Sequence, residues 1–174
     1  MDEFDPTDCG PQWRMRAFCE EQDSRGIFWP HPTWMMDGAS LKTLLTHCHN
    51  SVDTRLSHGY VRQFKIGITS DPWRRWAHEP EPCDDMRGYR AEGFHQLQVL
   101  FSTSHRGLVG PMEREVLKQY RRYAYETGGL TASGGHLLCG NRRQGGENAD
   151  FGSGPFYLYV AWKFNPGAPE LIER

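Results

Sequence analysis

A glycine and an arginine eight residues apart are the pair in this 174-residue chain best suited to chemistry. The segment 64–78 reads FKIGITSDPWRRWAH, in which Gly67 is followed by Arg75. A glycine in a strand lets another backbone or a phosphate approach closely. A guanidinium one turn into the next helix can reach the same spot, where its planar fork matches two phosphate oxygens. His78 lies on the same helical face as Arg75 and could accept a proton near neutral pH.

Glu113 is a second candidate, because it lies beside an apolar stripe. It comes three and four residues before Val116 and Leu117, in a helical pattern over 111–126. A carboxylate at the edge of a buried face is costly unless a cation or a metal pairs with it. Arg75 and Mg²⁺ are the natural partners. The alternative is that Glu113 only complements the dipole at the helix start.

The elements that must position these residues alternate between strand and helix. Residue periodicity and capping signals predict strands at 64–69, 95–101 and 156–164, and helices at 39–57, 72–78 and 111–126. Asp37 or Ser40 could cap the first of these helices, and Ser70 and Asp71 precede Pro72 at the start of the second. The order predicts an α/β (α+β) fold, with a small mixed three-stranded sheet flanked by helices.

Two parts of the chain differ in composition. Residues 1–38 contain four prolines and little periodicity, which predicts an irregular arm with aromatic anchors and, at most, a short helix around 12–21. Residues 39–174 form the expected domain, interrupted by a loop at 128–154 that contains nine glycines. The first forty residues are acidic and the remainder has a small basic excess, which suits a local phosphate-binding face.

The stretch from Phe64 to Gly67, followed by Arg75, resembles the second half-motif of the GIY-YIG nuclease superfamily, in the branch that reads K-I-G-I-T. The resemblance implies that Arg75 is the catalytic arginine and Glu113 the metal-binding glutamate. Asn141 or Asn148 would match an asparagine that the family often has after the glutamate-bearing helix. The implied fold is the small GIY-YIG-like α/β domain, with Phe64 where the second half-motif often has tyrosine.

The family's first half-motif lies on a strand before the second and carries a tyrosine thought to activate water. Two segments are candidates. Residues 59–61 supply Tyr60, and residues 26–28 read as a half-motif with Phe28 in the tyrosine position. Tyr60 or His78 would then take the proton from water.

The resemblance implies a metal-dependent endonuclease that hydrolyses DNA phosphodiester bonds with Mg²⁺ (or Mn²⁺) on Glu113. The alternative is a catalytically degenerate module that binds nucleic acid or a protein partner. DNA would contact phosphate-binding residues near the site and on the basic segments that follow. These are Lys65, Gly67, Arg74, Lys118, Arg121, Arg122, Asn141 and Arg142, with Arg106 and Arg143 on the same expected face.

Several bulk features bear on where the protein works. The sequence contains no run of about 18 apolar residues, so no membrane-spanning helix is predicted. The acidic N-terminus does not resemble a signal peptide. The five cysteines are odd in number and none forms a C-x-x-C pair, so neither a disulfide framework nor a zinc ribbon is indicated. We therefore expect an intracellular, reducing compartment, either cytoplasmic or nuclear.

Overall fold

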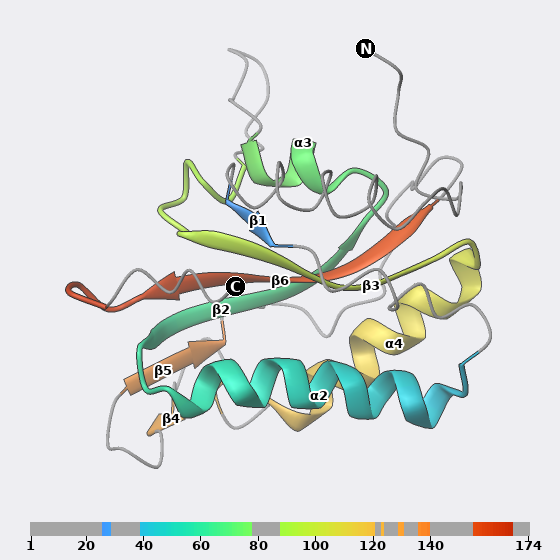
Figure 1. Ribbon diagram of the computed structural model, residues 1–174, viewed down its shortest axis with the longest axis horizontal. Helices are drawn as coiled ribbons and strands as arrows, with labels where there is room; N and C mark the ends of the chain where they lie inside the picture. Colours follow the sequence, from blue (N-terminus) through green and yellow to red (C-terminus); the bar gives the residue numbers. More distant parts are fainter. Residues whose placement is uncertain are drawn as a thin grey trace, which may run out of the picture.

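The fold is a mixed sheet with helices on both faces. The computed structural model describes residues 26–28, 39–77, 88–120, 123, 129–130, 136–139 and 155–168. The helices are α2 (Leu41–Ser57), α3 (Pro72–Ala77) and α4 (Arg106–Gln119). The strands are β1 (Ile27–Phe28), β2 (Val61–Thr69), β3 (Gln96–Thr103), β4 (Gly129–Leu130), β5 (His136–Cys139) and β6 (Phe156–Phe164). Strand and helix alternate from α2 to α4, and three further strands follow (Figure 1), which confirms the predicted mixed α/β class.

The sheet is larger than the three-stranded sheet that we expected. Its six strands run in the order β1-β3-β6-β2-β5-β4. The predicted strands are the three long ones in its centre, and the additional strands have two to four residues each. Strands this short show too few alternating residues for their periodicity to be recognised. The last of the described strands, β6, is central and runs antiparallel to both β2 and β3.

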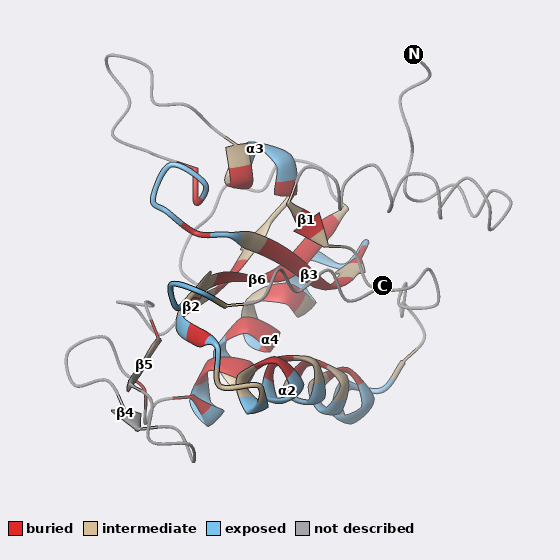
Figure 2. Ribbon diagram, turned by 60° about the vertical axis from the view of Figure 1, so that its left-hand side comes forward, coloured by how far each residue is buried: buried red, intermediate tan, exposed pale blue. Residues whose placement is uncertain are grey.

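Helices cover the two faces of the sheet unequally. Helix α3 lies on one face, and α2 and α4 lie on the other, as both ribbon views show (Figures 1 and 2). Strand β6 supplies both cores, because successive side chains point to opposite faces. Tyr157 and Tyr159 belong to the core under α3, whereas Leu158 and Val160 belong to the core under α2 and α4. Burial on both sides explains why β6 reads as a nearly continuous apolar run.

The first two of these helices begin where their capping residues predict. Ser40 Oγ accepts a hydrogen bond from the Thr43 amide at 3.2 Å and caps α2. Asp71 Oδ1 accepts one from the Arg74 amide at 2.8 Å at the start of α3. The predicted starts of these helices are therefore confirmed to within two residues.

Helix α4 is displaced from the range 111–126. It begins five residues earlier, so that Pro111 lies inside it, and it ends at Gln119. The Tyr120 amide donates to the Leu117 carbonyl at 3.0 Å, which tightens the last turn. The Tyr120 hydroxyl also donates to Asp53 of α2 at 3.0 Å. This bond fixes Tyr120 against α2 at the residue where α4 ends, whereas the apolar pattern alone predicted that the helix continues to 126.

Some expectations concern residues outside the described part of the chain. These are the short helix at 12–21, most of the arm 1–38 and most of the glycine-rich segment 128–154. Within the arm, Ile27 and Phe28 pair in parallel with β3, so this part is strand rather than irregular. No helix among the described residues is both long and apolar enough to cross a membrane.

Candidate functional site

The guanidinium of Arg75 meets two tyrosines on the face of the sheet that α3 covers. Its Nε donates to the Tyr159 hydroxyl at 3.2 Å, and its central carbon lies 5.5 Å from the centre of the Tyr89 ring. The two phenol oxygens are 3.0 Å apart. These three residues therefore form one connected group, which we call the Arg75 cluster. Arg75 is half-buried, whereas both tyrosines are buried.

Gly67 makes room for this cluster. It pairs with Tyr159 in the antiparallel register of β2 and β6. A Cβ atom added to Gly67 would lie 2.4 Å from the Tyr159 hydroxyl and 2.7 Å from its ring carbon Cζ. The phenol of Tyr159 therefore lies so close to residue 67 that only a glycine fits at this position. We predicted that Gly67 permits a close approach, and the group that approaches is a tyrosine side chain.

Lys65 adds a second cation to the same face, two residues before Gly67. Its ammonium lies 5.2 Å from the centre of the Tyr89 ring and 5.3 Å from that of Phe94, both within cation–π range. It also pairs with Glu92 at 2.7 Å. Lys65 thus lies beside the Arg75 cluster, as its predicted role in substrate binding requires.

The Tyr159 phenol is held in its neutral form. Burial raises its pKa well above the usual value, the neighbouring Tyr89 adds to this, and Arg75 opposes it. A neutral phenol can donate a hydrogen bond but is a poor proton acceptor. Because Arg75 Nε can only donate, the Tyr159 oxygen accepts from it, and the Tyr159 proton can point toward another acceptor. The cluster is therefore suited to stabilising negative charge on phosphate oxygens.

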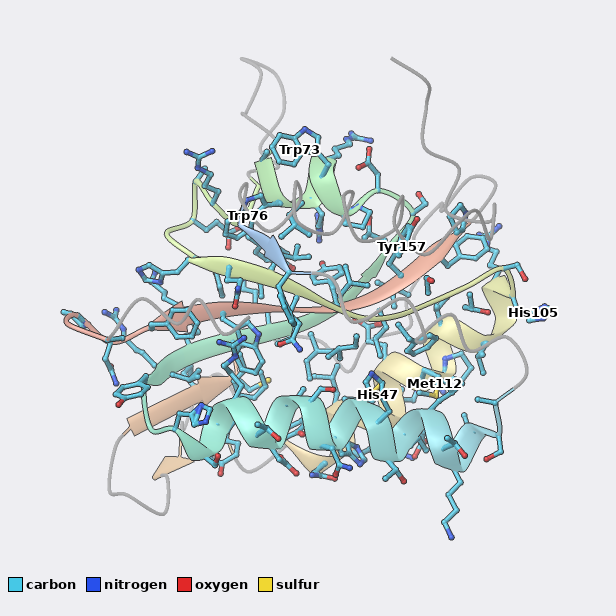
Figure 3. All side chains as sticks on the ribbon, in the orientation of Figure 1. His47, Trp73, Trp76, His105, Met112 and Tyr157 are labelled. Atoms are coloured by element: carbon cyan, nitrogen blue, oxygen red, sulfur yellow. The ribbon has the colours of Figure 1, made fainter. Side chains whose placement is uncertain are left out.

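Glu113 belongs to a helix on the other face of the sheet. It is buried, and its neighbours Met112 and Val116 are part of the core under α2 and α4. Figure 3 places Met112 on this side, and Trp76, which follows Arg75, on the side of α3. The arrangement thus separates the two helices that we expected to carry Arg75 and Glu113 into one pocket. Helical periodicity identifies the buried side of each helix but not the face of the sheet that it covers.

Tyr60 is far from the Arg75 cluster. It is 38% exposed and comes just before β2, seven residues ahead of Gly67 along an extended chain. At about 3.3 Å per residue, this places it roughly 20 Å from Gly67 along the strand. Its carbonyl accepts from the Asn165 amide at 2.8 Å, beyond the far end of β6. The predicted role of Tyr60 in activating water is therefore not supported by its position, and Tyr159 is the tyrosine that meets Arg75.

The remaining predicted contacts to DNA do not share one face. Arg74 is exposed on α3, whereas Lys118 is exposed on α4 and pairs with Glu115 of the same helix. Because the two helices cover opposite faces of the sheet, one bound DNA duplex does not contact both residues. Arg106 is exposed at the start of α4, on the same helix as Lys118. The other predicted site residues lie outside the described part of the chain, namely His78, Arg121, Arg122, Asn141, Arg142, Arg143 and Asn148.

Among the described residues, no group of three or more His, Cys, Asp or Glu side chains is close enough to hold an ion. Mg²⁺ often uses one carboxylate together with waters and substrate phosphates, so Glu113 alone is not an unsuitable ligand. Its helix, however, lies across the sheet from Arg75. The described residues therefore do not form a metal centre at the Arg75 cluster.

Sequence reasoning missed Tyr159 and Tyr89. The resemblance predicts the tyrosine on a strand before Phe64, whereas the central strand that pairs with β2 is β6, which comes near the end of the described chain. A usable signal was present, because Tyr157 and Tyr159 alternate within a strand of strong β propensity.

Comparison with protein-family models, with curated proteins and with solved structures found no match.

Proposed function

We propose that this protein is a metal-dependent endonuclease that hydrolyses DNA phosphodiester bonds at the Arg75 cluster. The observation that supports this most is the hydrogen bond from Arg75 to Tyr159. The phenol ring of Tyr159 lies directly over Gly67 of the K-I-G-I-T strand. The K-I-G-I-T strand resembles the second half-motif strand of the GIY-YIG family. In that family, the strand with the first half-motif carries a tyrosine and forms a hairpin with the second. Here β6 occupies the adjacent antiparallel position, although it follows β2 in the chain. We therefore propose that the two half-motifs occur in reversed order.

The proposed role of the cluster is to bind the phosphodiester and stabilise its transition state. Hydrolysis forms a bond from a water oxygen to phosphorus and breaks the bond to the leaving sugar oxygen. The water gives up one proton to solvent, and the leaving oxygen takes one up from solvent. Arg75 would stabilise the charge on the non-bridging oxygens, and its bond to Tyr159 fixes the orientation of the guanidinium fork. Lys65 would hold a neighbouring phosphate. The requirement for Mg²⁺ or Mn²⁺ on Glu113 stays a prediction, and no step above depends on it.

Incubation with labelled single-stranded, duplex and branched DNA, with Mg²⁺ or Mn²⁺ or with chelator, tests this function. Loss of one preorganised donor typically lowers a rate about 10²- to 10³-fold, so we expect Arg75→Ala to lose at least about 10²-fold. Arg62→Ala is the control, because Arg62 is an exposed arginine at the start of β2. Equal cleavage by wild type and Arg75→Ala would refute the site.

A second candidate function is a degenerate module that binds nucleic acid without cutting it. The observation in its favour is the position of α4 and Glu113 across the sheet from Arg75. The same experiment distinguishes the two, provided that binding is measured alongside cleavage. DNA binding that Arg75→Ala weakens, with no cleavage by the wild type under any of these conditions, would establish the module and exclude the enzyme.

A further inference from the structure

Helix α2 carries an apolar stripe on its inward side and a partly buried polar stripe beside it. Leu44, Cys48 and Val52 are fully buried and belong to the core under α2 and α4. The second stripe is polar and recurs at the same helical spacing. It consists of His47, Asn50, Ser51, Thr54 and Arg55, and it continues to His58 just after the end of the helix. A helix face turned toward a sheet is normally apolar, so this polar stripe calls for an explanation.

The polar stripe lines a cavity of about 270 Å³ between α2 and the edge of the sheet. Phe28 of β1 and Gln98 of β3 complete its lining. Arg55 and Gln98 are buried, whereas Asn50 and Thr54 are exposed at the helix surface. The cavity thus has a polar interior and opens to solvent along α2. It lies on the opposite face of the sheet from the Arg75 cluster, as the position of His47 in Figure 3 shows.

The hydrogen bonds around the cavity fix which groups face a ligand as donors. The indole Nε1 of Trp162 can only donate, and it meets Gln98 Oε1 at 3.0 Å. Because the oxygen of Gln98 is used in this bond, its amide nitrogen can donate to a ligand in the cavity. His47 Nε2 lies 2.8 Å from the Leu100 carbonyl, which can only accept, so this ring nitrogen carries a proton. Leu100 falls at an irregularity in the pairing of β3 with β6.

The described lining of the cavity has one side chain with a permanent charge, and that charge is positive. Arg55 is a permanent cation, and no Asp or Glu is among the described residues of the lining. Burial lowers the pKa of His47, so that His47 is mainly neutral at pH 7 and adds no second charge. A guanidinium with several hydroxyl and amide groups is suited to an oxyanion. The volume is just below the range of typical small-molecule sites, about 300–1,000 Å³, and so fits a small ligand.

We infer that this cavity binds a small phosphate-bearing ligand through Arg55, Gln98 and the hydroxyl groups of Ser51 and Thr54. The site is separate from the Arg75 cluster and does not depend on the proposed nuclease activity. Two sources of the phosphate are distinguished by experiment, namely inorganic phosphate and a nucleoside monophosphate. Phe28 supplies the apolar wall against which a base would lie.

Titration of the full chain with inorganic phosphate or AMP, at constant ionic strength in NaCl, tests the inference by NMR. We expect saturable shifts at the residues of α2, β1 and β3 that surround the cavity, whether or not phosphate also shifts the Arg75 cluster. Tighter binding of AMP than of phosphate would identify a nucleotide, and equal binding would identify the phosphate group alone as the ligand. Absence of saturable binding for both would refute the site.

Variants separate this site from the Arg75 cluster. Arg55→Met is expected to weaken binding by about tenfold or more, because it removes hydrogen bonds to a charged group. Ser51→Ala combined with Thr54→Val retains the buried arginine and should weaken binding about threefold or more, which keeps the test decisive if Arg55→Met does not fold. Arg62→Ala is the control, because Arg62 is exposed at the start of β2 and does not line the cavity, and it should bind like the wild type. Binding that survives both cavity changes, or that only Arg75→Ala abolishes, would overturn the inference.

Discussion

Gly67 and Tyr159 face each other across strands β2 and β6, with the phenol lying directly over the glycine. The glycine in the K-I-G-I-T stretch is thereby explained by packing, since a larger residue would displace the tyrosine. The same contact places the Tyr159 hydroxyl within reach of Arg75. One close approach between strands thus positions the group that we propose to bind phosphate.

Gly67→Ala should destabilise the protein and displace Tyr159. Overpacking of a well-packed core typically costs about 1–3 kcal/mol of unfolding free energy. Urea denaturation measures this cost, and Gly67→Ala combined with Tyr159→Phe should cost less than the sum of the single changes, because the nearest atom is gone. Gly107→Ala is the matched control. Nothing lies within 4 Å of a Cβ at this helical position, so it should be neutral or stabilise by up to about 1 kcal/mol. Equal losses at both glycines would contradict the packing account.

Stability should fall in mild acid because two histidines of α2 have lowered pKa values. Burial is the main cause for both His47 and His49, opposed by the Leu100 carbonyl and by Asp53 respectively. A base whose pKa is depressed on folding is protonated more readily when unfolded. Its contribution is therefore present above the unfolded pKa of about 6.5 and is lost as pH falls below it toward the folded value.

Denaturation at pH 7.5 and at pH 5 measures this loss. His47→Gln retains a donor for the Leu100 carbonyl but removes the titrating group, so it should reduce the slope of stability against pH below 6.5. A single group can change that slope by at most about 1.4 kcal/mol per pH unit. His105→Gln, at the start of α4, serves as the control. An unchanged slope in His47→Gln would show that His47 does not titrate differently on folding.

Tyr120→Phe should lower stability without touching the Arg75 cluster. The Tyr120 hydroxyl donates to Asp53 at 3.0 Å, and Gln119 Nε2 donates to the other oxygen of the same carboxylate at 2.9 Å. Loss of one bond to a charged group should cost about 1–2 kcal/mol. Asp53→Asn in the same background should then cost less than it does alone, because the two changes share one interaction. Additive costs would show that the bond contributes little to the docking of α2 on α4.

The sequence predicted local features well and distant pairings poorly. The caps at Ser40 and Asp71 and the three long strands depend on neighbouring residues, so they could be recognised from short segments. The bond from Arg75 to Tyr159 joins residues 84 positions apart. Its formation depends on β6 entering the sheet beside β2, and no local pattern specifies which strand takes that place.

The misplacement of two site residues has the same cause. The spacing of Glu113 from Val116 and Leu117 correctly predicted a position at a buried face, and Glu113 is buried. The face of the sheet that α4 covers is decided by chain connections outside that helix. Tyr60 was chosen because it precedes Phe64, whereas the topology assigns the central position to the strand that carries Tyr159.

A double-mutant cycle on DNA cleavage tests the central claim most directly. The single-turnover rate constant is measured for the wild type, Arg75→Ala, Tyr159→Phe and the double variant, with Tyr120→Phe as a buried tyrosine from the other core. If Arg75 and Tyr159 act as one unit, the double variant loses little more than Arg75→Ala alone, and Tyr120→Phe cleaves like the wild type. Losses that multiply, or a rate that neither single change lowers, would contradict the assignment of the Arg75 cluster as the nuclease site.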